Sequence, residues 1–74
     1  MMEIPRIARL ILEIPSSYGL KGKFLHDCYL DLMRIEMERD KPLSDDHVKQ
    51  LAVKWAKEHR EEMESYWKEW RARI

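Results

Sequence analysis

The sequence predicts an all-α fold, a single small domain of three helices that is completed by oligomerisation. Apolar residues recur at steps of three and four along most of the 74 residues, which is the period of a helix. Breaker residues interrupt this pattern in two short segments, so the predicted helices are residues 4–14, 20–39 and 44–73. A domain of this length is marginally stable unless a disulfide, a metal or a partner chain contributes.

The first predicted helix is short and has one apolar stripe. Pro5 suits a first helical turn, where its missing N–H would have no partner. Pro15 ends the helix, because the residue before a proline is disfavoured in the α region. The stripe consists of Ile7, Leu10, Ile11 and Ile14.

The segment from Pro15 to Gly22 is predicted to be a loop that brings two lysines to a helix N-terminus. Lys21 and Lys23 flank Gly22, and the free N–H groups and positive dipole end of a helix favour anions. The glycine spacing does not match a Walker loop. Two interpretations stay open, which are a contact to phosphate or nucleic acid and a solvated basic turn.

The central helix, residues 20–39, is apolar over roughly two-thirds of its circumference, more than one neighbour can cover. Glu36 lies inside this apolar arc, where an ionised carboxylate needs a partner. It is either a site residue paired with a lysine, an arginine or His59, or it reaches solvent or a subunit interface. Cys28 also lies on the arc, and we interpret it as a buried structural thiol.

The start of the third helix is the clearest local signal in the chain. Ser44 is a good N-cap, and Asp45 and Asp46 place negative charge on the first turn. Leu43 and Val48 occupy the two positions of a hydrophobic staple. A helix is therefore predicted to begin at Ser44.

No glycine or proline follows Ser44, so the sequence predicts one helix of about 46 Å, longer than a globule of about 30 Å. Its far end is rich in large aromatics, which dominate interface energetics. We predict that this end is an interface, most simply that of a homodimer. The alternative is a break near Glu61 that folds the aromatics into the core. The predicted interface consists of Met63, Tyr66, Trp67, Trp70 and Ile74.

The histidines and the cysteine do not predict a metal site or a cofactor. The positions of His26, Cys28, His47 and His59 match no compact ligand motif. His59 lies on the apolar stripe of the third helix, so we expect a buried histidine with a hydrogen-bond partner.

Composition limits the choice of partner and compartment. Fourteen basic and fourteen acidic residues give a formal net charge of zero, so no overall field attracts nucleic acid or anionic lipid. No apolar run approaches the roughly 20 residues that span a bilayer. A single thiol in an apolar arc is typical of a reducing compartment, so we expect a cytoplasmic protein without a membrane partner. Abundant charged residues are a compositional hint of a thermophile.

The sequence predicts binding rather than catalysis, because it contains no phosphate cradle and no recognisable nucleophile with its base. The first hypothesis is a helical protein-protein interaction module, either a homo-oligomer or a docking subunit of a larger assembly. The second is a helix-turn-helix DNA-binding regulator of the antitoxin or phage-repressor type, since residues 40–43 have the length of such a turn. It ranks second because Asp45 and Asp46 would meet the DNA phosphates.

Overall fold

The computed structural model describes residues 4–73, and over this range the predicted all-α class is confirmed. The described residues form four α-helices rather than the three predicted, together with one short 3₁₀ turn. In chain order these are α1 (Arg6–Leu12), η1 (Ser16–Tyr18), α2 (Lys23–Arg39), α3 (Asp45–Glu58) and α4 (Arg60–Ala72).

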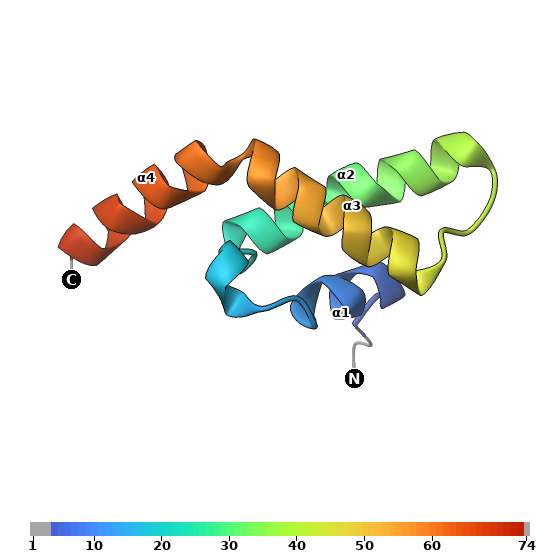
Figure 1. Ribbon diagram of the computed structural model, residues 1–74, viewed down its shortest axis with the longest axis horizontal. Helices are drawn as coiled ribbons and strands as arrows, with labels where there is room; N and C mark the ends of the chain where they lie inside the picture. Colours follow the sequence, from blue (N-terminus) through green and yellow to red (C-terminus); the bar gives the residue numbers. More distant parts are fainter. Residues whose placement is uncertain (1–3, 74) are drawn as a thin grey trace.

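Three of the helices form a compact unit and the fourth projects from it. Figure 1 shows α1 beneath α2 and α3, with α4 continuing from the end of α3 toward the C-terminus. Because α2 contacts both α1 and α3, its wide apolar arc has neighbours on two sides. The described chain measures 42 × 32 × 19 Å.

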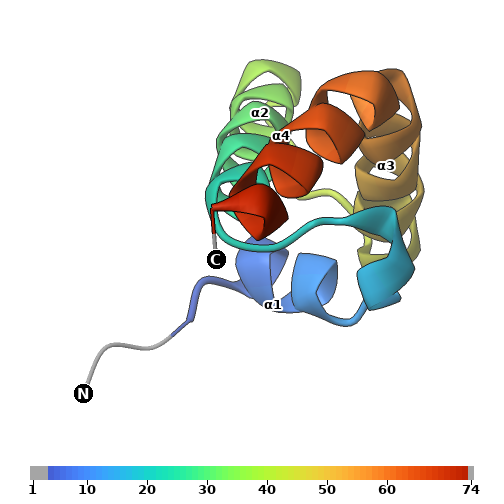
Figure 2. The ribbon, with the colours of Figure 1, turned by 90° about the vertical axis from the view of Figure 1, so that its left-hand side faces the viewer.

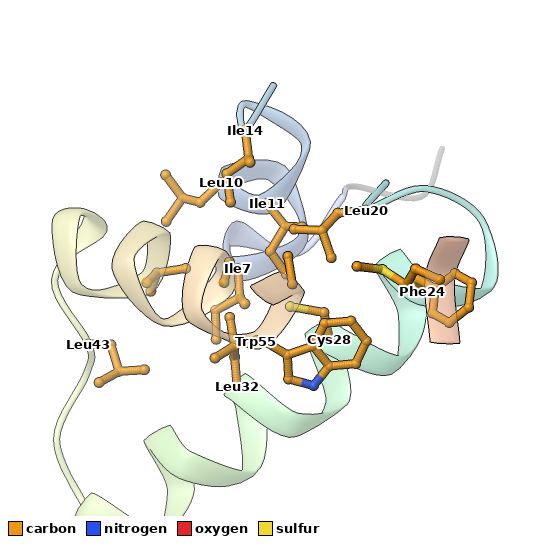
Figure 3. Close-up of a cluster of buried hydrophobic side chains, with 14 residues drawn as sticks. Ile7, Leu10, Ile11, Ile14, Leu20, Phe24, Cys28, Leu32, Leu43 and Trp55 are labelled. Atoms are coloured by element: carbon orange, nitrogen blue, oxygen red, sulfur yellow. The ribbon is translucent and has the colours of Figure 1, made fainter. Parts of the chain in front are cut away.

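The core lies where α1, α2 and α3 meet (Figure 3). On α2 the buried stripe consists of Phe24, Cys28 and Leu32, each four residues after the last. The link before α3 contributes Leu43, and α3 contributes Val48. The whole buried set is Ile7, Leu10, Ile11, Ile14, Leu20, Phe24, Cys28, Leu32, Leu43, Val48, Ala52, Trp55, Ala56 and Met63.

The first two helices, α1 and α2, are shorter than the sequence predicts. Pro5 is the N-cap of α1, and the helix ends at Leu12, two residues before its predicted end. Gly22 is the N-cap of α2, so that helix begins at Lys23. Gly19 and Gly22 both have positive φ values, 77° and 57°, which prevent the α2 helix from starting earlier.

The start of α3 follows the predicted local signals. The Oγ atom of Ser44 accepts a hydrogen bond from the backbone N–H of His47, at 3.2 Å. Leu43 and Val48 are both fully buried, as a hydrophobic staple requires.

The prediction of one uninterrupted helix from Ser44 to the C-terminus is wrong, because the helix is interrupted at His59. The backbone of His59 has φ −105° and ψ 15°, outside the α region. Its ring stacks on Trp55 at 3.9 Å between centroids, and Nδ1–H donates to the carbonyl oxygen of Trp55 at 2.8 Å. The backbone N–H of His59 shares this acceptor at 3.0 Å. A side chain that enters the helical hydrogen-bond ladder in this way bends the helix.

Candidate functional site

The segment that joins α1 to α2 is a turn with two glycines of positive φ. Pro15 precedes η1, and Gly19 follows it in the αL conformation. The backbone N–H of Lys21 then donates to the carbonyl oxygen of Gly19 at 2.9 Å. This turn, residues 16–22, is the surface on which α4 packs.

α4 is attached to the turn and to the start of α2 by its aromatic face. The rings of Phe24 and Tyr66 meet edge to face at 5.2 Å, and Phe24 and Trp67 meet at 6.0 Å. The indole N–H of Trp67 donates to the carbonyl oxygen of Gly19 at 3.4 Å. Figure 2 shows the last helix in front of the turn, viewed from the C-terminal end. The bend at His59 therefore allows α4 to cover the beginning of α2.

These contacts change the part that each predicted interface residue plays. Met63 is buried within the chain, at 4% exposure, and Tyr66 and Trp67 are half-buried against the core. Trp70 is different, because 48% of its surface is exposed. Ile74 lies outside the described residues. A straight helix would have left all of these aromatic side chains exposed. Of the predicted interface residues within the described chain, only Trp70 is exposed.

The two lysines of the turn lie against aromatic rings. The Lys21 ammonium is 5.0 Å from the centroid of the Trp67 ring. The Lys23 ammonium is 5.5 Å from Phe24 and 5.4 Å from Tyr66. Cation–π contacts of this kind stabilise the packing of α4 on α2, and both lysine residues stay exposed to solvent.

A groove runs between the turn and the two C-terminal helices, and we call it the turn–α4 groove. It consists of two adjoining hollows of about 360 and 570 Å³ that share Ser17, Gly19, Trp67 and Arg71. The first hollow is also lined by residues of α3 and α4, and the lining of the second includes Trp70. Its remaining lining is Ser16, Tyr18, Lys21, Gly22, Ala56, Lys57, Arg60, Met63 and Glu64.

The charged lining of this groove is mostly basic. Arg60 is paired with Glu64, with 2.9 Å between Nε and Oε1, and this hydrogen bond raises the pKa of Arg60. Arg71 donates from Nε to the carbonyl oxygen of Trp67 at 3.4 Å. Among residues 4–73, neither Arg71 nor Lys57 has an ion pair. The groove therefore presents cations beside an aromatic wall.

One wall of this groove has a helical spacing that the sequence displays. Lys57, Arg60, Glu64, Trp67 and Arg71 follow one another at steps of three and four, which places them on one side of α3 and α4. The other wall of the groove is the turn, residues 16–22, about 40 residues earlier in the chain. No local sequence pattern predicts that these two segments lie side by side.

Glu36 lies at the opposite end of α2 from the groove. Its Oε2 atom accepts a hydrogen bond from the backbone N–H of Leu43 at 2.9 Å and lies 3.5 Å from Nη1 of Arg6. Its partner is therefore Arg6 rather than His59. Glu36 connects α1, α2 and the link to α3, and its side chain is only partly exposed.

His59 is half-buried and has the hydrogen-bond partner described above, the carbonyl oxygen of Trp55. Trp55 in turn donates its indole N–H to Oδ2 of Asp31 at 2.6 Å. These contacts connect the end of α3 to the middle of α2. The polar atoms of His59 and Asp31 therefore serve the packing of these two helices.

The remaining candidate residues do not assemble a metal or redox centre in the described chain. No group of three or more potential ligands lies close enough to hold a metal ion within residues 4–73. Cys28 is fully buried, and burial, with a smaller contribution from the charge of Asp31, raises the pKa of its thiol to about 12.

Comparison with models of protein families, with curated proteins and with solved structures finds no match to this chain. No described helix combines the length and the hydropathy that a bilayer span requires. The fold and the groove together define a class only, a small all-helical domain with a basic and aromatic surface groove.

Proposed function

We propose that this chain is a protein-protein interaction module that docks a partner in the turn–α4 groove, with Trp70 as its anchor. The observation that carries the proposal is the position of Trp70, which lines the groove and is 48% exposed. Its ring meets Trp67 edge to face at 6.0 Å, so the exposed indole is held against a partly buried one. Tryptophan is one of the residue types enriched at energetic hot spots of protein interfaces.

The arrangement of α4 supports this proposal. The helix projects beyond the three-helix unit, as Figure 1 shows, and only its Met63, Tyr66 and Trp67 face is needed to attach it. The last turn is left to carry Trp70 and Arg71 beside the groove. A second copy of the chain and a different protein are both admissible partners, and the two experiments below distinguish them.

DNA binding by a helix-turn-helix is the weaker proposal. Asp45, at the N-terminal end of α3, accepts a hydrogen bond from Nη2 of Arg6 at 3.1 Å. One of the few arginines near this helix end is therefore already occupied by a carboxylate, and Asp46 adds a second negative charge. Phosphates would be repelled from this end of α3.

The first experiment measures molar mass by light scattering over a range of protein concentrations. If the partner is a second copy, the mass rises toward a dimer, and Trp70→Ala weakens association by about 2–4 kcal/mol. Leu30→Ala is the matched control, because Leu30 is an exposed apolar residue of α2 that lies outside the groove.

The second experiment selects binders from a displayed library of short peptides with the wild-type chain and with Trp70→Ala. We expect peptides that bind the wild type and the Leu30→Ala control but are lost with Trp70→Ala. A monomeric wild type that selects no Trp70-dependent peptide contradicts the proposed function.

A further inference from the structure

We infer that the occupant of the turn–α4 groove is an acidic segment of a partner protein, with an apolar side chain against Trp67 and Trp70 and carboxylates at Lys57 and Arg71. This inference rests on the proposed function and specifies the chemistry of the partner.

The charge of the groove favours an acidic occupant. Four cations line it, Lys21, Lys57, Arg60 and Arg71, against one carboxylate, Glu64, although the whole chain has a net charge of zero. Glu64 is already bonded to Arg60. The excess positive charge is therefore local to this surface, where complementary charges steer a partner and fix its register.

The geometry of the cations favours carboxylates as their ligands. Arg71 uses Nε for the carbonyl oxygen of Trp67, and its terminal nitrogens have no hydrogen-bond partner within residues 4–73. A guanidinium fork binds a carboxylate through two parallel hydrogen bonds. Lys57 lies at the other end of the same side of α3 and α4, so the two cations flank the apolar part of the groove formed by Met63 and Trp67.

Single-stranded nucleic acid fits the same groove less well. Nucleic acid needs open aromatic faces on which bases stack, and the Lys21 ammonium lies over the ring of Trp67. A polyanion longer than the groove would also meet the exposed carboxylate of Glu61, one helical turn from Lys57. A short acidic segment stays within the basic region.

A second copy of the chain is a poor occupant by the same criterion. The most exposed apolar side chain among residues 4–73 is Met37, at 73%. Its neighbours Glu38 and Asp40 are balanced by Arg39 and Lys41. Leu30 is also exposed and lies beside Asp27 and Asp31, but both oxygens of Asp31 are bonded within the chain, to Trp55 and to Arg34. Leu12 adjoins Glu13, which is paired with Lys49. The carboxylates around these apolar residues are thus partly neutralised within the chain, and we assign the occupant to a different protein.

The test uses fluorescence anisotropy with three labelled probes and the full chain. The first probe is a short peptide with a Leu-Phe pair flanked on both sides by glutamates. The second replaces each glutamate by glutamine, and the third is a short oligothymidylate. We expect the acidic peptide to bind at least about ten-fold more tightly than its glutamine counterpart, and to weaken as salt is raised from about 0.05 to 0.5 M.

Matched double variants assign the binding to the groove. Lys57→Gln with Arg71→Gln removes two groove cations, and we expect it to weaken the acidic peptide about three-fold to ten-fold without affecting the glutamine peptide. Lys54→Gln with Lys68→Gln removes the same charge from α3 and α4 at exposed positions outside the groove, and we expect less than about a two-fold change.

Each other outcome overturns the inference in a recognisable way. Equal binding of the two peptides removes the role of charge and leaves the proposed function intact. Tighter binding of oligothymidylate, weakened by the groove variant, replaces the protein partner with nucleic acid and overturns the proposed function as well. Equal losses in the two double variants show that net charge alone is responsible. If no probe binds, the acidic occupant is rejected, and the mass and peptide-library experiments decide the proposed function separately.

Discussion

Replacing Glu36 by alanine should destabilise the chain much more than replacing Glu38, an exposed carboxylate on the same helix. The Oε2 atom of Glu36 accepts the backbone N–H of Leu43 at 2.9 Å and lies 3.5 Å from Nη1 of Arg6. Leu43 is buried, so its N–H group loses its partner when the carboxylate is removed. The same change disconnects α1 from the end of α2.

The magnitude follows from these two contacts. A hydrogen bond from a buried N–H to a charged acceptor contributes about 1.5–3 kcal/mol. The ion pair with Arg6 is partly exposed, 38% for Arg6 and 27% for Glu36, so it adds at most about 1 kcal/mol. We expect Glu36→Ala to lower the free energy of unfolding by about 1.5–4 kcal/mol and the melting temperature by about 6–30 °C.

The assay is thermal and urea unfolding followed by circular dichroism, with two comparison variants. Glu38→Ala changes an exposed carboxylate on the same helix and should cost no more than about 0.5 kcal/mol. Glu36→Gln keeps an oxygen acceptor for Leu43 and should lose less than Glu36→Ala. If Glu36→Ala and Glu38→Ala are equally stable, Leu43 is solvated or has another partner, and the reasoning is refuted.

Three further predictions concern the turn, the core thiol and the contact between α2 and α3. Gly19→Ala places a side chain at φ 77° and should cost about 1–2 kcal/mol of unfolding free energy, measured by urea unfolding, whereas Ser17→Ala should be nearly neutral. Because burial raises the pKa of Cys28 to about 12, the native thiol should react slowly with a thiol reagent at neutral pH and quickly in denaturant; rapid native labelling would contradict its burial. The contribution of the protonated Cys28 thiol to stability should be complete below pH 9.0, the ordinary pKa of a thiol, and be lost as the pH rises toward 12. Unfolding midpoints measured across that pH range would show this loss. Asp31→Ala removes the acceptor of the Trp55 indole N–H and should cost about 1–3 kcal/mol and shift the tryptophan emission; an unchanged spectrum and midpoint would contradict the contact.

The helical class and the clearest helix start were predictable because their signals are local. Ser44 caps α3 through an N–H group three residues away, and Leu43 and Val48 are five residues apart. The stripe of Phe24, Cys28 and Leu32 repeats with the period of the helix that buries it. Such interactions are formed by neighbours in the chain, so the sequence alone displays them.

The break at His59 was decided by tertiary structure. No breaker occurs between Ser44 and the end of the chain, and histidine is an acceptable helix residue. The bend brings Met63, Tyr66 and Trp67 onto the turn and Phe24, and this burial of aromatic surface offsets the lost helical hydrogen bonds. The stabilisation from this burial depends on a surface about 40 residues earlier in the chain. The helical period of the residues around His59 does not reveal that surface.

The sequence by itself determined that this chain is helical, where α3 begins, and that Trp70 belongs to an aromatic helix end. Only the tertiary structure decided that Met63, Tyr66 and Trp67 pack within the chain, that Glu36 pairs with Arg6, and that Lys21 and Arg71 border one groove. The physical reason is the range of the interactions. Caps and stripes act over one or two helical turns, whereas the bend, the Glu36 contacts and the groove depend on residues brought together only when the helices pack.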